Sequence, residues 1–344
     1  MSSANTDHRT IVTVHAMYVF DAYALDTIQA ATCAKTASCT PVYMATLSMS
    51  AALQPQCTNY RRRLMPSEFR ADHATFKDFT DSDIETELSV GMWLKRRSSW
   101  FHRLRYVRSD EDCEKLVQSV AGMNEDFTFS VSFSPVLVAG VCKQGFLPMA
   151  IQAAADFAVL APKLHKHRCI MDFADLHIPK SVIKKAKKYK ITVDECFDFC
   201  LQSCCTQHGE HCWFYPALIN AYRHIFECGG LNGVKMHSIE VWAGDDVVAG
   251  EVGYAVGGVY TSLSGFTLQD SAGTVQCCAV PKLLKACGFA FWDLGMALKY
   301  KEDIGGRSVP RKVFLERFRS VRSNDGIVLT CPDHGNAREI LRLS

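Results

Sequence analysis

Two consecutive β-hairpins near the middle of the chain constrain its fold more than any other feature. The stretch reads HSIEVWAGDDVVAGEVGYAVGGVY over residues 237–260, with apolar side chains alternating through Ile239 and Val241. This alternation predicts half-buried strands, and Gly244–Asp246 interrupts it where a hairpin would turn. With a further strand over 259–266, the stretch predicts an antiparallel meander at the centre of a sheet.

Helices are predicted before this meander. Thr192 followed by Glu195 has the spacing of a capping box, which marks the start of a helix. Apolar side chains then recur at helical spacing at Val193, Cys196, Phe197, Cys200, Leu201 and Cys204. A second helix is predicted to open with Pro216 in its first turn and to end at Gly229.

Helix and strand alternate again after the meander. Asp270 or Ser271 can cap a helix, which Pro281 should kink or split. Residues 289–294 have the pattern of a short buried strand, and Pro310 opens a last helix. This order predicts an α/β fold of the acetyltransferase-like (GNAT-type) class, in which a mixed sheet is flanked by helices and preceded by a smaller N-terminal domain.

The chain of 344 residues is long enough for two domains with separate cores. The predicted parts are an N-terminal domain over 67–175, an acetyltransferase-like catalytic domain over 176–325 and a C-terminal tail over 326–344. Residues 1–66 differ in composition, with no Asp or Glu from Ile28 to Met65. We favour a disordered extension there. The alternative is a mitochondrial targeting segment, if translation starts at Met44.

The 16 cysteines would suggest disulfides in a small secreted protein. However, the N-terminal MSSANTDHRT lacks the basic and apolar regions of a signal peptide, so reduced thiols inside the cell are predicted. No apolar run reaches the length of a membrane span. We therefore expect a soluble, cytoplasmic monomer without a cofactor and without membrane contact.

A lysine-rich segment suggests binding to a polyanion. Between residues 180 and 190 there is no acidic residue, and the lysines are Lys180, Lys184, Lys185, Lys187, Lys188 and Lys190. Neighbouring like charges on a helix repel one another. Lysine contacts to phosphates give affinity without sequence preference, so the segment favours a nucleic-acid partner over a plain solvated helix face.

A second cluster contains possible metal ligands. Cys205, His208, His211 and Cys212 have spacings that could close a tetrahedral zinc site. The cysteines just before them have a simpler role as small apolar side chains on a helix. We therefore predict no metal.

Several motifs follow one another in a fixed order between about residues 130 and 318. They are SFSPVLVAGVCKQGFLPM (132–149), LHIPKS (176–181), CWF with YP and AY (212–222), HSIEVW (237–242), Trp292-Asp293 and IGGRSVPRKVFL (304–315). In sequence and in order they resemble the motifs of the leucyl/phenylalanyl-tRNA–protein transferases, a family with an acetyltransferase-like fold.

The resemblance implies that Leu or Phe is moved from charged tRNA to the N-terminal Arg or Lys of an acceptor protein, which marks that protein for degradation. It implies that Asp293 is catalytic, either orienting the attacking amine or accepting its proton. It also implies an apolar pocket for the Leu or Phe side chain, walled by Phe266, Tyr260 and Trp292. The lysine-rich segment then supplies the expected tRNA contacts, which are Lys180, Lys184, Lys185, Lys187 and Lys188.

The chain departs from the family's pattern at several positions. The family's Gly-Glu-Ser-Met-Phe-Ser becomes SLSGFT, so Leu263 stands where an acid is expected to meet the acceptor's cationic side chain. Gly295 stands in place of a glutamine, and the family's Trp-Trp has no counterpart between the first two motifs. Glu240 or Glu251 could have taken over the role of the missing acid.

These departures leave a second class of function open, a catalytically silent relative that binds tRNA or protein N-termini. A CoA-dependent acetyltransferase is disfavoured. Its pyrophosphate needs a Gln/Arg-x-x-Gly-x-Gly/Ala turn at a helix N-terminus, and the corresponding TLQDSAGTV lacks that spacing.

Overall fold

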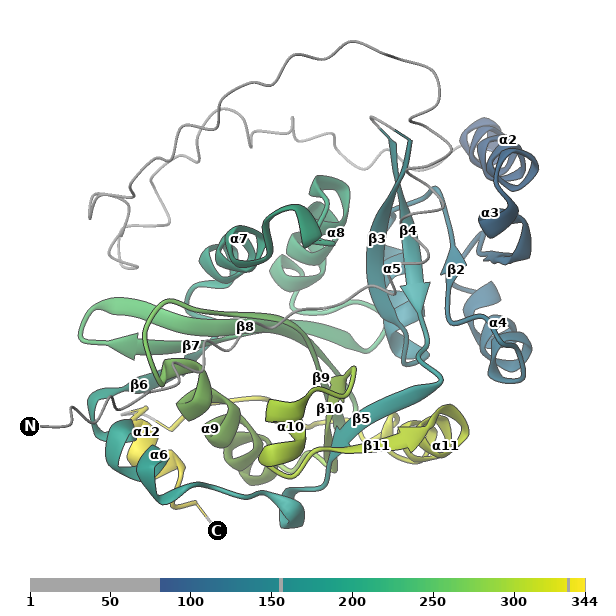
Figure 1. Ribbon diagram of the computed structural model, residues 1–344. Coiled ribbons are helices and arrows are strands. Elements are labelled where there is room, and N and C mark those ends of the chain that lie inside the picture. The colour runs from purple at the N-terminus through teal and green to yellow at the C-terminus, as the bar shows by residue number, and fades with distance from the viewer. Residues whose placement is uncertain (1–80, 155–156, 333–334, 344) are drawn as a thin grey trace, which may run out of the picture. The chain divides into compact units, whose positions relative to one another are not determined.

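The computed structural model describes residues 81–154, 157–332 and 335–343 (Figure 1). The predicted extension over 1–66 and the first residues of the predicted N-terminal domain lie outside these ranges. No helix within the described ranges is long and apolar enough to cross a membrane.

A seven-stranded mixed sheet forms the centre of the described structure. Its strands are β5 (His167–Met171), β6 (Lys190–Val193), β7 (Val234–Ala243), β8 (Asp246–Val256), β9 (Val259–Thr267), β10 (Phe291–Gly295) and β11 (Arg307–Pro310). The order across the sheet is β11-β5-β10-β9-β8-β7-β6, and the pair of β9 with β10 is parallel while its other pairs are antiparallel. The predicted meander is confirmed as β7, β8 and β9.

Glycines make the two tight turns of the meander. Gly244 follows β7 with a φ of 64°, and Gly257 follows β8 with a φ of 51°. At Gly257 a Cβ would lie only 2.4 Å from the backbone of Arg322, so both the left-handed backbone and the close approach require glycine there. The run therefore turns back on itself after about ten residues instead of continuing as one long strand.

Helices cover both faces of this sheet (Figure 1). On one face lie α7 (Phe197–His208) and α8 (Pro216–Glu227), and on the other lie α6 (Lys180–Lys185), α9 (Ala272–Ala286) and α12 (Ala337–Ile340). The main apolar core lies between the sheet and the second group of helices, and it includes Val275 and Ala279 of α9. We call these two sides the α7 face and the α9 face.

The region before the sheet has a small core of its own. Its elements are α2 (Asp81–Arg97), α3 (Ser99–Arg103), β1 (Arg105–Tyr106), α4 (Asp112–Ala121), β2 (Thr128–Phe129), α5 (Pro135–Lys143), β3 (Leu147–Ala154) and β4 (Phe157–Lys163). β3 and β4 form an antiparallel hairpin, and Leu94, Phe101, Phe129 and Val159 pack together. Arg311, at the start of α11 (Arg311–Val321), ties this region to the sheet because its guanidinium donates to the carbonyls of Val120, Met123 and Glu125 and to the Asp126 carboxylate.

The predicted start of the helix before the meander is wrong. Thr192 lies in β6, and α7 begins only at Phe197. The Thr192 hydroxyl donates to Glu240 at 2.6 Å instead of capping a helix, and Glu240 also accepts from the backbone N–H of Cys196 at 3.1 Å. A carboxylate from β7 therefore performs the capping that the sequence pattern assigns to Thr192 and Glu195.

Two other expectations differ from the structure. α9 continues without interruption through Pro281, which is buried and removes one backbone N–H without splitting the helix. The helix after Pro310, α11, is followed by the short α12, so it is not the last one. α8 begins at Pro216 and ends before Gly229, as predicted.

The predicted division at residue 175 falls just after β5, an inner strand of the large sheet. The predicted tail over 326–344 contributes α12, whose Ala337 and Ile340 are buried in the main core. The domain boundaries themselves stay a prediction.

Candidate functional site

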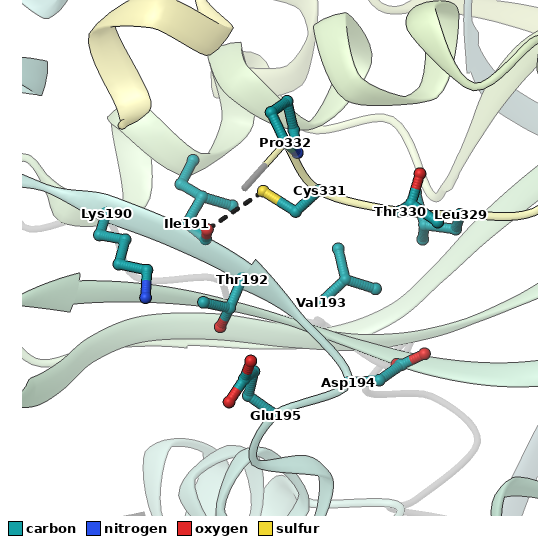
Figure 2. A pocket seen from close by; sticks show the side chains of 10 residues that line it. All are labelled: Lys190, Ile191, Thr192, Val193, Asp194, Glu195, Leu329, Thr330, Cys331 and Pro332. Carbon is teal, nitrogen blue, oxygen red and sulfur yellow. Dashed lines mark hydrogen bonds between the residues drawn. The ribbon is translucent and has the colours of Figure 1, made fainter. Parts of the chain in front are cut away.

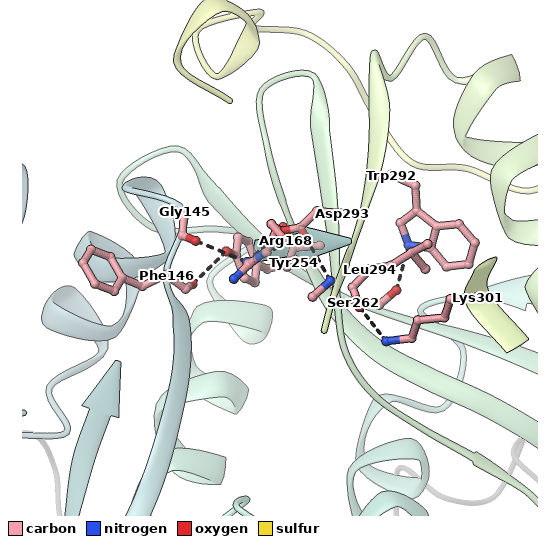
Figure 3. Close-up of polar contacts among 11 residues, drawn as sticks. Gly145, Phe146, Arg168, Tyr254, Ser262, Trp292, Asp293, Leu294 and Lys301 are labelled. Atoms are coloured by element: carbon pink, nitrogen blue, oxygen red, sulfur yellow. Dashed lines mark hydrogen bonds and ion pairs between the residues drawn. The ribbon is translucent and has the colours of Figure 1, made fainter. Parts of the chain in front are cut away.

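Asp293 lies on β10 in the middle of the sheet and is completely buried (Figure 3). Its carboxylate accepts two hydrogen bonds from Arg168, one from Nε to Oδ1 at 2.8 Å and one from Nη2 to Oδ2 at 2.7 Å. The Thr261 hydroxyl donates to Oδ2 at 3.0 Å, and the backbone N–H of Gly295 donates to Oδ1 at 3.0 Å. Four hydrogen bonds thus hold this carboxylate in place, so it can fix the position of the strands and the turn around it.

Arg168 connects Asp293 to the first motif of the chain. Its Nη2 also donates to the carbonyl of Gly145 at 3.2 Å, and its guanidinium lies 4.8 Å from the centre of the Phe314 ring. Next to it, the Tyr254 hydroxyl donates to the carbonyl of Phe146 at 2.9 Å (Figure 3). The turn at residues 145–146, within SFSPVLVAGVCKQGFLPM, is therefore bonded directly to the strands around Asp293.

Sequence analysis did not single out Arg168. The segment HRCIMDF places one charge inside an otherwise apolar strand, and a buried arginine needs an acidic partner. That signal predicts a buried ion pair, although it does not name Asp293, which lies 125 residues further along the chain.

The three predicted pocket residues do not line one pocket. Successive side chains of a strand point to opposite faces of a sheet. Tyr260 and Trp292 pack into the main core on the α9 face, where their strands pair side by side. Phe266 lies on the α7 face, where its ring contacts Phe199 of α7 at a centroid distance of 6.0 Å. A bulge in the pairing of β8 with β9 shifts the alternation between Tyr260 and Phe266, and a count along the sequence does not reveal such a shift.

A carboxyl group lies where the sequence predicts an apolar pocket. Glu251 of β8 is 7% exposed, and its Oε1 accepts from the Ser262 hydroxyl at 2.8 Å. That hydroxyl in turn accepts from Nε1 of Trp292 at 2.8 Å (Figure 3). Burial raises the pKa of the Glu251 carboxyl to about 7, although Ser262 and Tyr260 partly oppose the shift. A carboxyl with a pKa in this range is typical of functional sites.

Glu240, the other acid considered at this point, has a structural environment. It is fully buried on the α7 face, and Ser238 donates to it together with Thr192 and the Cys196 N–H. Burial raises its pKa, and these three donors oppose that shift. Of the two acids, Glu240 therefore anchors the start of α7, whereas Glu251 has fewer donors around it.

The remaining residues of the HSIEVW motif join β7 to its neighbours. His237 Nδ1 lies 2.8 Å from the Asp194 carboxylate, which also accepts from the Ser238 N–H. Trp242 Nε1 donates to the Thr192 hydroxyl at 2.7 Å. In this chain the motif forms a polar network at the edge of the sheet.

The two positions that depart from the family's pattern are both buried. Leu263 is 1% exposed, within β9, next to the bulge. Gly295 ends β10 with a φ of 72°, and its N–H is bonded to Asp293. A residue with a side chain would be strained at this φ, which favours glycine at this position.

The predicted tRNA-binding lysines are all exposed. Lys180, Lys184 and Lys185 lie on α6, and Lys187 and Lys188 lie on the 3-10 turn η6 (Ala186–Lys188), so that the predicted single helix is two short ones. Lys185 Nζ donates to the Ser271 hydroxyl at 2.7 Å, which joins α6 to the start of α9. The cluster lies on the side of the sheet that carries Glu251.

The cysteine and histidine cluster forms no metal centre in the described part of the chain, where no three such side chains converge. Cys205 and Cys212 are free thiols that interact with each other, and the Cys205 thiol donates to the carbonyl of Phe214 at 3.9 Å. Cys200 and Cys204 are buried on α7, as their spacing predicts.

A hollow lies between the edge strand β6 and the segment after α11 (Figure 2). It is lined by Lys190–Glu195 and by Leu329–Pro332, and the Cys331 thiol donates to the carbonyl of Ile191 at 3.1 Å. Four strand spacings separate β6 from β10, which is on the order of 19 Å along the sheet. The hollow is therefore remote from Asp293.

Comparison with known proteins relates the sheet to one family. Residues 170–319 match the family model described as "Leucyl/phenylalanyl-tRNA protein transferase". The transferase of that name from Paracoccus denitrificans (strain Pd 1222) is 28% identical over 178 residues, which are 51% of this chain and 79% of the relative. The one from Stutzerimonas stutzeri (strain A1501) is 30% identical over 146 residues, which are 41% of this chain and 62% of the relative.

A solved structure, the C-terminal domain (DUF2156) of a putative lysylphosphatidylglycerol synthetase from Agrobacterium fabrum, covers 64% of this chain and 80% of its own. Its TM-score is 0.33 at 11% identity, which is too low to define the fold. The family match spans β6 to β11 and includes Asp293, Glu251 and the lysine cluster. Through this region the chain is similar to the leucyl/phenylalanyl-tRNA protein transferases.

Proposed function

We propose that the protein is an aminoacyltransferase that moves an amino acid, Leu or Phe in the family, from charged tRNA to the N-terminal residue of an acceptor protein and so marks it for degradation. The single observation that supports this most is the family match over residues 170–319, because these residues include most of the sheet and the buried carboxylate at its centre. We also infer that the mixed sheet with helices on both faces is of the acetyltransferase-like type.

The proposed reaction requires few catalytic groups. The α-amine of the acceptor attacks the ester carbon of the aminoacyl-tRNA, a C–N bond forms, the C–O bond to the tRNA breaks, and one amine proton leaves with the ribose hydroxyl. An α-amine has a pKa of about 7.7 to 8.0, so part of it is neutral near pH 7. Positioning of the two substrates and stabilisation of the oxyanion would supply most of the rate.

In this proposal Asp293 acts as a positioning residue. Its carboxylate accepts hydrogen bonds from Arg168, Thr261 and the Gly295 N–H, so it orients the end of β10. Through Arg168, which also donates to the Gly145 carbonyl, it orients the turn at residues 145–146. The proposal therefore favours an orienting role for Asp293 over proton transfer.

The exposed lysines on α6 and η6 are proposed to contact the tRNA backbone. Phosphate contacts from lysine do not depend on sequence, which suits a protein that accepts more than one tRNA. A second candidate function is a silent relative that binds tRNA or protein N-termini, and the buried Leu263 and the left-handed backbone at Gly295 favour it.

A transfer assay distinguishes the two. Labelled leucine or phenylalanine on tRNA would be offered with peptides that begin with Arg, Lys, Asp, Glu or Met, and binding of the tRNA and of the peptides would be measured in parallel. Transfer by the wild type that is retained in the surface variant Asp303→Asn supports the enzyme. Loss of transfer in Asp293→Asn supports a role of Asp293 in the reaction only where thermal unfolding shows that this variant is folded. Binding without transfer supports the silent relative, and neither binding nor transfer contradicts both.

A further inference from the structure

The end of α2 and the segment after it are strongly basic, and they lie outside residues 170–319, which the family model matches. Residues 95–108 read KRRSSWFHRLRYVR, with six lysines and arginines and no acidic residue. That is as many positive charges as the lysine-rich segment carries over residues 180–190. The exposed arginines are Arg96, Arg97, Arg103, Arg105 and Arg108.

The packing of α2 against α3 and β1 brings these arginines into one region of the surface. α2 and α3 lie next to each other (Figure 1), and Lys95 Nζ donates to the carbonyl of Leu104 at 3.0 Å, which ties the end of α2 to the end of α3. At Gly91 a Cβ would lie 2.5 Å from the Tyr106 ring, so the absence of a side chain there lets β1 approach α2 closely. Leu94 and Leu104 are buried in the small core beneath, which leaves the opposite face of α2 to solvent.

An aromatic ring lies exposed among these charges. Trp93 is 48% exposed, although an indole is a large side chain that is usually well buried. Helical spacing places Arg96 and Arg97 on the same face as Trp93, and the Arg97 guanidinium lies 5.3 Å from the centre of the Trp93 ring. The outer face of α2 thus offers a flat ring flanked by positive charges.

Most of these charges have no counter-charge within the protein. Four of the five exposed arginines form no ion pair with an acid in the described ranges, and the exception is Arg103, which pairs with Glu125 at 3.1 Å. A helix C-terminus stabilises nearby cations, which accounts for Arg96 and Arg97. It accounts neither for the exposed indole beside them nor for the arginines that follow on β1 and after it.

We propose that this surface binds RNA, with an unpaired base stacked on Trp93 and the flanking phosphates bound by arginines. We call it the arginine patch, and its members are Trp93, Arg96, Arg97, Arg105 and Arg108. The planar guanidinium binds phosphate through two-point contacts, and unpaired bases of RNA stack on aromatic side chains. The inference goes beyond the proposed transfer reaction, because the patch lies outside the family match and its test requires no transfer.

Two other partners with negative charge fit this patch less well. A helix that lies on a membrane needs a broad apolar face, and within residues 87–97 the exposed large apolar side chains are Met92 and Trp93. An acidic protein segment would neutralise the charges but offers no planar group for the indole. RNA supplies both phosphates and flat bases, so it engages every member of the patch.

Fluorescence anisotropy on the full chain, with a short labelled oligouridine and with uncharged tRNA, tests the ring. Trp93→Leu keeps an apolar side chain but removes the ring, so it should weaken oligouridine binding at least about fivefold. Trp93→Phe keeps a ring and should retain most of the affinity. The quenching of tryptophan fluorescence that oligouridine causes in the wild type should be lost in Trp93→Phe, because the stacked indole is gone.

The charges are tested by two double variants, Arg96→Gln/Arg97→Gln and Arg105→Gln/Arg108→Gln. Each should weaken the binding of both RNAs, and with oligouridine each should reduce the slope of log K against log salt by roughly 0.7 for each phosphate that is no longer neutralised. Thermal unfolding would show that the variants are folded, and the second double variant tests the patch if the one on α2 is not.

The matched control Lys312→Gln/Arg319→Gln removes two exposed charges from α11 and should change neither affinity nor slope. An equal loss in this control would overturn the inference, as would undiminished RNA binding in the patch variants. Binding of anionic lipid vesicles or of polyglutamate through the patch, without binding of RNA, would overturn it in favour of a membrane or an acidic protein. RNA binding through the patch without any transfer of Leu or Phe would support it and contradict only the proposed enzyme.

Discussion

Arg168 and Asp293 lie 125 residues apart in the chain and form a two-point ion pair that is completely buried. The pair joins β5 to β10, and its remaining bonds reach the turn at Gly145 and the hydroxyl of Thr261. A single polar cluster thus connects the first motif of the chain with the centre of the sheet.

Removing one partner of this pair should be strongly destabilising. We expect Arg168→Met or Asp293→Asn to lower the free energy of unfolding by about 3–5 kcal/mol, because each leaves a buried polar group without its counterpart. The double variant Arg168→Met/Asp293→Leu should lose less than the sum of the single losses. Denaturant unfolding checks this, with Glu125→Gln, from a half-exposed pair with Arg103, as a control that changes little.

The raised pKa of Glu251 makes stability depend on pH. The folded protein holds the carboxyl proton up to about pH 7, whereas the unfolded chain loses it near pH 4.5. Protonation of Glu251 therefore stabilises the folded state at low pH, and this stabilisation is lost as the pH rises through 7. Glu251→Gln should therefore gain up to about 3 kcal/mol relative to the wild type between pH 5 and pH 8. Unfolding measured across this range checks it, and parallel curves for the two proteins would contradict it.

Restoring an acid at position 263 should not restore the family's recognition of a cationic acceptor. Leu263 is buried within β9, so Leu263→Glu places a carboxyl in the interior and should cost more than about 2 kcal/mol of stability. Leu263→Met, which keeps the volume, should cost less than about 1.5 kcal/mol. Unfolding and peptide binding on both variants check this, and a stable Leu263→Glu protein with a new preference for N-terminal Arg would show the prediction to be wrong.

Binding of tRNA should depend on salt through the lysine cluster. Replacing Lys184, Lys185, Lys187 and Lys188 by Gln should weaken binding and reduce the slope of log K against log salt by roughly 0.7 to 0.9 for each phosphate that the variant no longer neutralises. Replacing Lys115 and Lys312 by Gln serves as the matched control, because both lysines are exposed, on α4 and α11. An unchanged slope in the cluster variant would place the tRNA elsewhere.

Sequence patterns predicted the meander, α8 and the exposed lysines because each depends on local order. Alternation and two glycine turns define β7 to β9, and Pro216 with Gly229 bounds α8. Contacts between distant segments were not predictable in this way. Arg168 reaches Asp293 only once β5 has been inserted beside β10, and Glu240 caps α7 from another strand.

The sequence did not predict on which side of the sheet each pocket residue lies, and the reason is a different one. One extra residue at the bulge in β9 changes the side to which each following side chain points. The result separates Phe266 from Tyr260 and places Glu251 beside Trp292. Pairing register, which involves two strands at once, is needed to see this.

Trp292 and Asp293 are neighbours in the chain, yet they belong to opposite faces of β10. Trp292 reaches Glu251 through Ser262, while Asp293 is held by Arg168 and Thr261, so the two sets of polar partners have no member in common. Substitutions around Trp292 can therefore change one face of β10 while the hydrogen bonds of Asp293 on the other face remain intact. A strand built in this way can vary in sequence on one face and keep the same hydrogen-bonded support on the other.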